Sequence, residues 1–418
     1  MWPISKDGRI DRLVVFATLP GNEIAPVGEL AFEGRGRRQS IFRYAGSWLK
    51  RANDKFPVAP TLPLRAKAEL SNPSEVPLAF YDAAPDGWGR SVLAQAFPNQ
   101  VWGMAELLAG AGDDRTGQLR FGPDPDSGPQ QFGPGEPMFE MPDGDALLED
   151  LLDAAVAVDE GRPRSHHLHL LFRSSSDIGG ARPKTHIMRN GRSWIAKFPA
   201  VGDSFDEPRV ETVCLDLAEA CGIDVPQRDV IRIAGRSVML VERFDRGAEG
   251  QRHGYTSAAT LLKQPPTEYA TMSTYSELAT VAREKGVVPF EAELFRRLLF
   301  NCFIHNTDDH TRNHAFLYLD GVWTLSPAFD LVPSQRPRLV LAPAPKIDPK
   351  PDPLLAFMAY PMFRLDWQAA SDIYSQVASG LAKLEAILEQ REISAKDRET
   401  LKVWMPTAFS PPPCPAAV

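Results

Sequence analysis

The chain has 418 residues, of which 43% are hydrophobic and 24% charged, and its formal net charge at pH 7 is −8. This length predicts two or three folding units, and the negative charge argues against a protein that coats nucleic acid by charge alone. Because no apolar run is long enough to span a bilayer and the N-terminus has no apolar signal segment, we expect a cytoplasmic protein that does not contact membranes.

The first part of the chain, residues 1–110, is expected to form an α/β unit of its own. Short strand-like runs occur at 13–17 and 27–32, and a helical pattern covers 86–97. Residues 111–147 are crowded with Gly, Pro and Asp and show little periodicity, which predicts a loop or linker.

The rest of the chain changes character near residue 268. Residues 148–268 alternate between strand-like and helical patterns, and residues 269–418 are mainly helical. The predicted helices cover 145–158, 209–221, 275–285, 289–305 and 373–389, and the predicted strands cover 187–189, 193–198, 229–233 and 237–243. An α/β half followed by a helical half is the arrangement of a two-lobed kinase, in which the nucleotide lies between the lobes.

The spacing of polar residues in 306–330 is the strongest indication of function. Asp308 precedes Asn313 by five residues, and Asp330 follows a hydrophobic strand-like run. Enzymes of the protein-kinase type use this order for a base Asp and for an Asn and an Asp that hold Mg²⁺. His310 is a further candidate that could contact phosphate or brace the loop. A polar loop that caps backbone groups is the simpler alternative, but it does not account for the spacing.

Lys197 ends a strand-like run that precedes this set. Kinases carry a Lys at such a place to neutralise nucleotide phosphates, and a Glu from a helix braces it. Glu211 lies early in the next predicted helix and could be the brace, with Glu207 as a nearby alternative. A strand-end Lys alone is usually a solvated side chain, so this assignment depends on its order before Asp308.

Two adjacent glycines, Gly179 and Gly180, mark a candidate phosphate loop that continues through Ala181 to Lys184. Glycines let backbone N–H groups approach phosphate oxygens, and Lys184 or Arg182 could add positive charge. The spacing is not that of a Walker loop, and a plain hairpin turn is the alternative.

Glu242 and Phe244 follow a predicted strand, at the point where the hinge of a two-lobed kinase offers backbone groups to adenine. Phe244 fits equally well as a core residue.

Taken in order, these motifs resemble those of the HipA family of serine/threonine kinases, the toxin half of bacterial HipA–HipB toxin–antitoxin pairs. The resemblance covers nearly the whole chain and rests on residues 27–30, 44–49, 85–90, 179–184, 195–199, 241–246, 306–313 and 328–330. It implies a fold of α/β and all-α parts: a two-lobed protein-kinase-like fold with an N-terminal α/β subdomain and a helical C-terminal lobe.

The resemblance also implies the cofactors ATP and Mg²⁺ and a role for each matched residue. The catalytic Asp would be Asp308, the Mg²⁺ ligands Asn313 and Asp330, the phosphate-binding Lys Lys197, and the residues beside adenine Glu242 and Phe244.

Members of the family phosphorylate a protein hydroxyl, and glutamyl-tRNA synthetase is their best-known substrate. The resemblance therefore implies a toxin kinase that acts on an aminoacyl-tRNA synthetase or another translation factor. It also implies a HipB-like antitoxin as partner and contact with operator DNA only through that antitoxin. Members also phosphorylate a Ser in their own Gly-rich loop. The expected position of that Ser is occupied here by Asp177. Either the loop register shifts and Ser176 is the autophosphorylation candidate, or Asp177 is a permanent acidic residue at that position.

Two other functions remain open from the sequence. The chain could be a catalytically weak kinase-fold protein that serves mainly as antitoxin partner and co-repressor, because the charge of Asp177 near ATP phosphates would lower affinity. It could also phosphorylate a small molecule, as aminoglycoside phosphotransferases do. Those enzymes usually carry a His two residues before the catalytic Asp, where this chain has Asn306.

Overall fold

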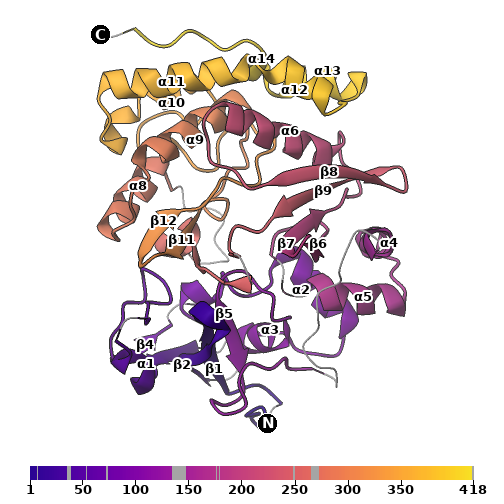
Figure 1. Cartoon of the computed structure of the whole chain (residues 1–418), viewed down its shortest axis with the longest axis vertical. Helices are drawn as coiled ribbons and strands as arrows, with labels where there is room; N and C mark the ends of the chain where they lie inside the picture. The colour runs from indigo at the N-terminus through magenta and orange to yellow at the C-terminus, as the bar shows by residue number, and fades with distance from the viewer. Residues whose placement is uncertain are drawn as a thin grey trace.

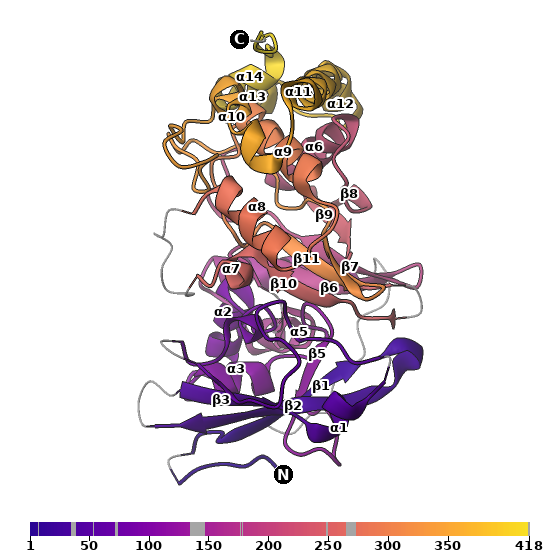
Figure 2. The ribbon, with the colours of Figure 1, turned by 90° about the vertical axis from the view of Figure 1, so that its left-hand side faces the viewer.

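The computed structural model of the chain describes residues 1–6, 8–34, 39–52, 54–71, 74–133, 147–175, 177, 179–247, 250–264 and 273–416. The N-terminal sheet lies at one end of the long axis and the last helices, α11 to α14, lie at the other (Figures 1 and 2). Within the described ranges, no helix has the length and apolar character needed to cross a membrane.

The N-terminal region, residues 1–133, is built on a five-stranded antiparallel sheet in the order β4-β3-β2-β1-β5. Its core contains Phe42, Phe80 and Phe121, whose side chains are almost fully buried. The strands are β1 (Arg12–Thr18), β2 (Ile24–Glu33), β3 (Gln39–Tyr44), β4 (Glu69–Leu70) and β5 (Leu119–Gly122). The helices are α1 (Gly46–Lys50), α2 (Gly87–Ala96) and α3 (Met104–Gly110), and short 3-10 turns are η1 (Pro20–Asn22) and η2 (Leu78–Phe80).

The middle region, residues 147–247, holds a four-stranded antiparallel sheet in the order β6-β7-β9-β8. Alternate residues of β9 face opposite sides, as the two-residue period of a strand requires. Leu240 joins a core with α4, whereas Met239 and Val241 join a core with α6. The elements are α4 (Leu148–Asp159), α5 (Ser165–Ser175), β6 (Lys184–Arg189), β7 (Arg192–Lys197), α6 (Glu207–Ala220), β8 (Arg228–Ile233) and β9 (Arg236–Glu242).

The C-terminal region, residues 250–416, consists mainly of helices around the buried α9, and it carries the three-stranded sheet β10-β11-β12. That sheet presents the loop 306–314 before β11 and the segment 326–330 after β12. The strands are β10 (Gly254–Ser257), β11 (Ala315–Leu319) and β12 (Val322–Leu325). The helices are α7 (Ala258–Leu261), α8 (Tyr275–Glu284), α9 (Glu291–Phe303), α10 (Pro353–Phe357), η5 (Tyr360–Phe363), α11 (Trp367–Leu381), α12 (Leu384–Gln390), α13 (Ala395–Trp404) and α14 (Pro406–Phe409).

The predicted helices over 86–97, 209–221, 275–285 and 289–305 are confirmed to within a few residues. The predicted helix over 373–389 is instead two helices, because α11 ends at Leu381 and the N–H of Lys383 closes a turn on the carbonyl of Gly380. β5 lies inside the stretch predicted as a loop, 111–147, and pairs with β1. Its four residues are too few to show a period in the sequence.

The division of the chain at 110, 147 and 268 stays a prediction. The strand pairings group β5 with the N-terminal region and β10 with the C-terminal region.

Candidate active site

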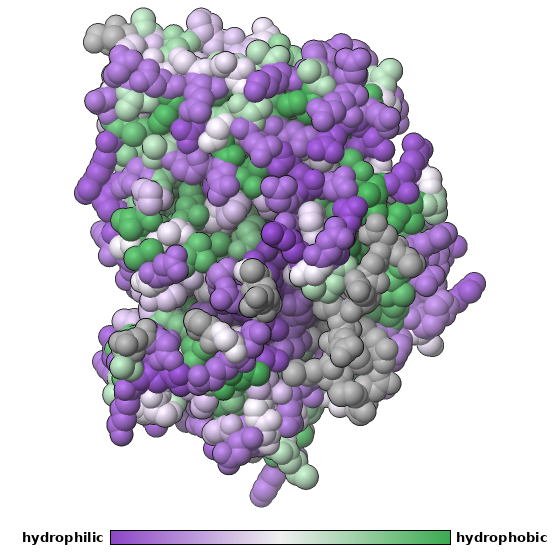
Figure 3. Space-filling model, in the orientation of Figure 1, coloured by the Kyte–Doolittle hydropathy of each residue, from purple (hydrophilic) through white to green (hydrophobic). Residues whose placement is uncertain are grey.

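A cavity of about 1300 Å³ lies where the three regions meet. On the face shown in Figure 3, hydrophilic residues gather around a hollow near the middle of the molecule. The cavity is larger than the usual range for a small-molecule pocket, about 300–1000 Å³. The residues predicted to bind nucleotide, to hold metal or to act in catalysis line it: Gly179, Gly180, Ala181, Lys184, Lys197, Glu242, Phe244, Asp308, His310, Asn313 and Asp330. Ser176 lies outside the described residues.

Lys197 links two carboxylates from different elements. Its Nζ lies 2.5 Å from Oε1 of Glu211 on α6 and 3.0 Å from Oδ1 of Asp330. Burial disfavours the ammonium charge, but the carboxylates of Asp330 and Glu211 outweigh it and raise the pKa of Lys197. The attraction of Lys197 holds the pKa of Asp330 well below its usual range, so Asp330 is ionised at neutral pH. Glu207 does not share this contact, because it pairs with Arg182 at 2.9 Å.

Asp330 adopts a backbone conformation that non-glycine residues rarely use, with φ of +61°. Strained backbone is often found at functional sites, where the surrounding structure holds it. The conformation turns the carboxylate toward Lys197. Asn313 also lines the cavity and adds an amide oxygen, so the donor set on this side consists of the hard oxygens that Mg²⁺ prefers.

The loop before β11 separates two neighbouring aspartates. Asp308 has a side chain that is 49% exposed, and its Oδ1 lies 2.6 Å from Nη1 of Arg336. Asp309 is buried and accepts hydrogen bonds from the hydroxyl of Tyr275 and from Nε2 of His314. Burial opposes the charge of Asp309, yet His314 lowers its pKa. Asp309 thus braces the loop, whereas Asp308 is available to a ligand.

His310 lines the same cavity. Its Nδ1 is buried and has no hydrogen-bond partner among the residues that the structure describes. A buried, unpaired ring nitrogen is costly, so a ligand group at this point would satisfy it.

Asp177, the residue at the position expected for an autophosphorylated Ser, does not line the cavity. It is buried and forms an ion pair with Nε2 of His186 at 3.3 Å. Burial opposes its charge, but His186 lowers its pKa.

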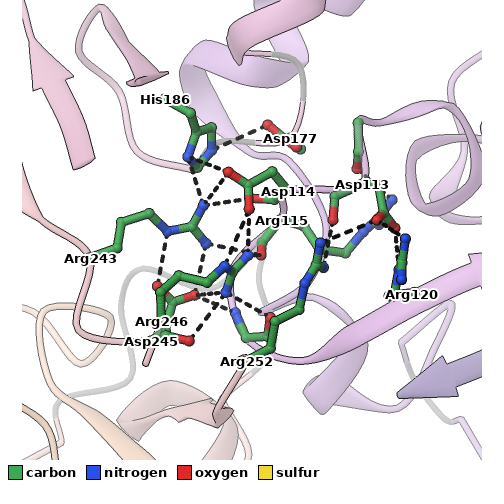
Figure 4. Close-up of polar contacts among 12 residues, drawn as sticks. Asp113, Asp114, Arg115, Arg120, Asp177, His186, Arg243, Asp245, Arg246 and Arg252 are labelled. Atoms are coloured by element: carbon green, nitrogen blue, oxygen red, sulfur yellow. Dashed lines mark hydrogen bonds and ion pairs between the residues drawn. The ribbon is translucent and has the colours of Figure 1, made fainter. Parts of the chain in front are cut away.

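The hinge segment, residues 242–246, is tied to the N-terminal region by buried ions (Figure 4). Arg243 is paired with Asp245 at 2.8 Å and with Asp114 at 2.9 Å, and Nη1 lies 2.7 Å from Nδ1 of His186. Arg246 pairs with the same two carboxylates. Desolvation opposes these charges, but Arg243 and Arg246 lower the pKa of Asp245.

The two residues predicted to border adenine are oriented differently from one another. Glu242 pairs with Arg192 at 2.6 Å. Phe244 is half-buried on the cavity wall, and its ring centroid lies 5.4 Å from that of Phe329. Phe244 is therefore in contact with the segment that carries Asp330, and its place beside adenine stays a prediction.

Sequence reasoning missed three residues that the structure brings to this site: Asp86, Arg312 and Arg336. Asp86 contacts Arg312 at 3.1 Å and Gly180, and Arg336 contacts Asp308. Residues 85–90 form one of the motifs that carry the family resemblance, but Asp86 lies 94 residues before Gly180 in the chain, so local spacing does not reveal their contact.

The fold and the site together define a kinase-like protein. A family model described as the HipA-like C-terminal domain matches residues 176–390, and one described as the HipA N-terminal domain matches residues 23–122. The first match alone covers more than half of the chain, so the chain belongs to the HipA family.

Known relatives agree with this membership. The chain is 27% identical over 312 residues to "Putative kinase Y4mE" of Sinorhizobium fredii, which covers 70% of this chain and 71% of the relative. It is 30% identical over 155 residues to Y4dM of the same organism, covering 34% of this chain and 37% of that protein.

One solved structure matches almost the whole fold. It is the toxin–antitoxin complex of HipA, HipB and operator DNA from Shewanella oneidensis. The match has a TM-score of 0.64 at 16% sequence identity and covers 95% of this chain and 96% of the other. The likeness shows that this chain has the two-lobed kinase-like fold, with an α/β part and a helical part.

Proposed function

We propose that this chain is a Mg²⁺- and ATP-dependent protein serine/threonine kinase that acts as the toxin of a HipA–HipB pair in the cytoplasm. The observation that carries the proposal is the contact of Lys197 with Glu211 and Asp330 in the cavity that Asp308 and Asn313 also line. An active kinase requires a strand Lys paired with a helix Glu and an Asp placed to hold Mg²⁺.

The residues divide the work of phosphoryl transfer between them. Lys197 would bind nucleotide phosphates, and Glu211 would hold it in the orientation found here. Asn313 and Asp330 would hold Mg²⁺, which supplies positive charge to the transferring phosphoryl group. Asp308 would orient the acceptor hydroxyl and accept its proton, after leaving Arg336. The Nδ1 of His310, which has no partner among the residues that the structure describes, would bind a phosphate oxygen or the acceptor.

The partners and the substrate class are proposed from the family. The structure with the similar fold was solved with HipB and operator DNA. A HipB-like antitoxin that contacts operator DNA is therefore the proposed partner, and an aminoacyl-tRNA synthetase or another translation factor is the proposed acceptor. Ser176 remains the candidate for autophosphorylation.

The alternative function, a catalytically weak partner and co-repressor, depended on the charge of Asp177 near ATP. Asp177 itself does not line the cavity, and its carboxylate contacts His186, which does. The reason for expecting weak nucleotide binding at that residue is therefore removed.

The test is transfer of label from γ-labelled ATP by the purified protein, to itself and to proteins of a cell lysate. Asp308→Ala and Asp330→Ala should each lower transfer by about three orders of magnitude or more, since Asp308 would orient the attacking hydroxyl and Asp330 would hold the Mg²⁺ that the transfer needs. Glu399→Ala, an exposed change on α13, is the matched control and should transfer normally. Full transfer by either Asp variant would contradict the proposal.

A further inference from the structure

The turn at residues 85–88, which leads into α2, contacts the candidate phosphate loop, residues 179–184. Asp86 occupies the N-cap position of α2, but its side chain caps no amide of its own helix. Its Oδ1 instead accepts a hydrogen bond from the N–H of Gly180. In return, the N–H of Trp88 in the first turn of α2 donates to the carbonyl oxygen of Gly180 at 2.7 Å. The turn and the loop thus form hydrogen bonds to backbone groups of each other, which a capping side chain or water would otherwise satisfy.

Glycines on both sides permit this close approach. A Cβ atom on Gly87, whose φ is +34°, would lie 2.4 Å from the carbonyl oxygen of Gly180. A Cβ atom on Gly179 would lie 2.9 Å from Oδ1 of Asp86. Larger residues would push the turn and the loop apart, so the contact is built into both segments.

The carboxylate of Asp86 lies among groups that suit a phosphate. Its Oδ2 accepts a hydrogen bond from Arg312 at 3.1 Å. Lys184 ends the loop, and its ammonium lies next to Gly180, where a Cβ atom would be 2.3 Å from Nζ. Burial and then Lys197 lower the pKa of Lys184, and the charge of Asp86 opposes that shift. A backbone N–H at a glycine, a guanidinium and a nearby ammonium are the donors that bind phosphate oxygens in proteins. Because the side chain of Asp86 is 42% exposed and lines the cavity, a ligand can reach and replace it.

We infer that Asp86, which the N-terminal region contributes, is a positioning residue. Without nucleotide, its carboxylate binds the phosphate loop at the point where a nucleotide phosphate would bind. When the nucleotide binds, Asp86 releases Gly180 and Arg312. The inference rests on the proposed nucleotide site. The N–H of Gly180 carries one proton, so a carboxylate and a phosphate oxygen compete for it, and their like charges repel. Nucleotide binding therefore moves the turn 85–88 away from the loop. By linkage, any partner that holds the turn 85–88 against the loop lowers the affinity of the protein for nucleotide.

The test compares the affinities of Mg²⁺-ATP and adenosine by calorimetry in the wild type, Asp86→Asn and Asp86→Ala. Removing the carboxylate charge should tighten ATP binding by about fivefold, as expected for one like charge removed from a partly solvated site. Adenosine carries no phosphate, so its affinity should not change. Asp348→Asn is the control, since it makes the same change in net charge at a 40% exposed carboxylate that pairs with Lys350.

Three results would contradict the inference in distinguishable ways. Weaker ATP binding in both Asp86 variants would mean that Asp86 only braces the loop. An equal change for ATP and adenosine would mean that the whole site was altered. Absence of ATP binding to the wild type would overturn the proposed function, and this inference with it.

Hydrogen–deuterium exchange on the unmodified protein gives a second measurement that needs no variant. With saturating Mg²⁺-ATP, the amide of Trp88 should lose protection because its acceptor, the carbonyl of Gly180, has moved away. The amide of Gly180 should stay protected, because phosphate replaces Asp86. Unchanged protection at Trp88 would overturn the inference.

Discussion

The N-terminal region holds the hinge and the phosphate loop in two different ways. At the hinge, Arg243 and Asp245 are 2% and 6% exposed and share several ion pairs (Figure 4). At the phosphate loop, the contact consists of one backbone hydrogen bond, from Trp88 to Gly180, and of the half-exposed carboxylate of Asp86. Buried, multiply paired ions are costly to separate, whereas an exposed carboxylate exchanges partners easily. The comparison indicates that the wall of the cavity at residues 242–246 is rigid and that the wall at the loop 179–184 is adjustable.

The largest effect is expected at the hinge. Arg243→Ala would leave Asp114 and Asp245 buried without their main partner, and should lower the free energy of unfolding by about 3–5 kcal/mol. Chemical denaturation followed by circular dichroism measures this. Arg398→Ala breaks an exposed pair with Glu385 and should cost less than about 1 kcal/mol. Equal losses in the two variants would remove the contrast between buried and exposed pairs.

A third contact, at Asp82, should give a pH-dependent effect. Asp82 accepts hydrogen bonds from the backbone N–H and the hydroxyl of Ser257, which joins the N-terminal region to α7. Burial raises the pKa of Asp82 to about 6, although the hydrogen bonds from Ser257 oppose this. A raised pKa favours the folded state at low pH, and this contribution is lost as pH rises from about 4 to about 6.

Asp82→Asn removes that titration. The unfolding free energy of the variant relative to the wild type should therefore increase by about 2 kcal/mol between pH 4.5 and pH 7.5. Thermal or chemical unfolding at the two pH values measures the difference. A difference independent of pH would show that Asp82 is ionised at both.

The ion pair between Asp308 and Arg336 should behave as an exchangeable contact. Both side chains are about half exposed, at 49% and 57%. Arg336→Ala should therefore change the rate of label transfer by less than about fivefold, since exposed pairs contribute at most about 1 kcal/mol. A loss as large as that of Asp308→Ala would instead make Arg336 part of the reaction itself.

The smallest effect is expected for the stability of Asp86 variants. Asp86→Ala should change the free energy of unfolding by less than about 1 kcal/mol, because its carboxylate is exposed enough for water to replace it. A loss comparable to that of Arg243→Ala would mean that the phosphate loop is held as rigidly as the hinge, and it would contradict the proposed difference between the two contacts.

The sequence predicted the elements whose patterns are long and local. Helices α6, α8 and α9 have clear helical spacing and were found where expected, and β7 was predicted from its apolar run. The short β5 and the polar α5 were not predicted, because four residues and a His-rich surface give weak periodicity.

The candidate site was predictable to the extent that its motifs follow a known order. The spacing from Asp308 to Asn313, and then to Asp330, is local in sequence, and the structure brings these residues to one cavity with Lys197. Their catalytic roles remain predictions. The contacts of Asp86 with Gly180 and of Asp114 with Arg243 join residues far apart in the chain, so spacing could not reveal them. The sequence places the charge of Asp177 next to the candidate phosphate loop but does not show that its partner is His186.

The most direct test of the account is the Mg²⁺ dependence of ATP binding. We predict that Mg²⁺ tightens ATP binding to the wild type by about tenfold or more, and that Asp330→Asn loses most of this gain, because the ionised carboxylate beside Lys197 is the proposed metal ligand. Calorimetry with Mg²⁺ and with a chelator measures both proteins. The same Mg²⁺ dependence in the wild type and in Asp330→Asn would contradict the proposed site.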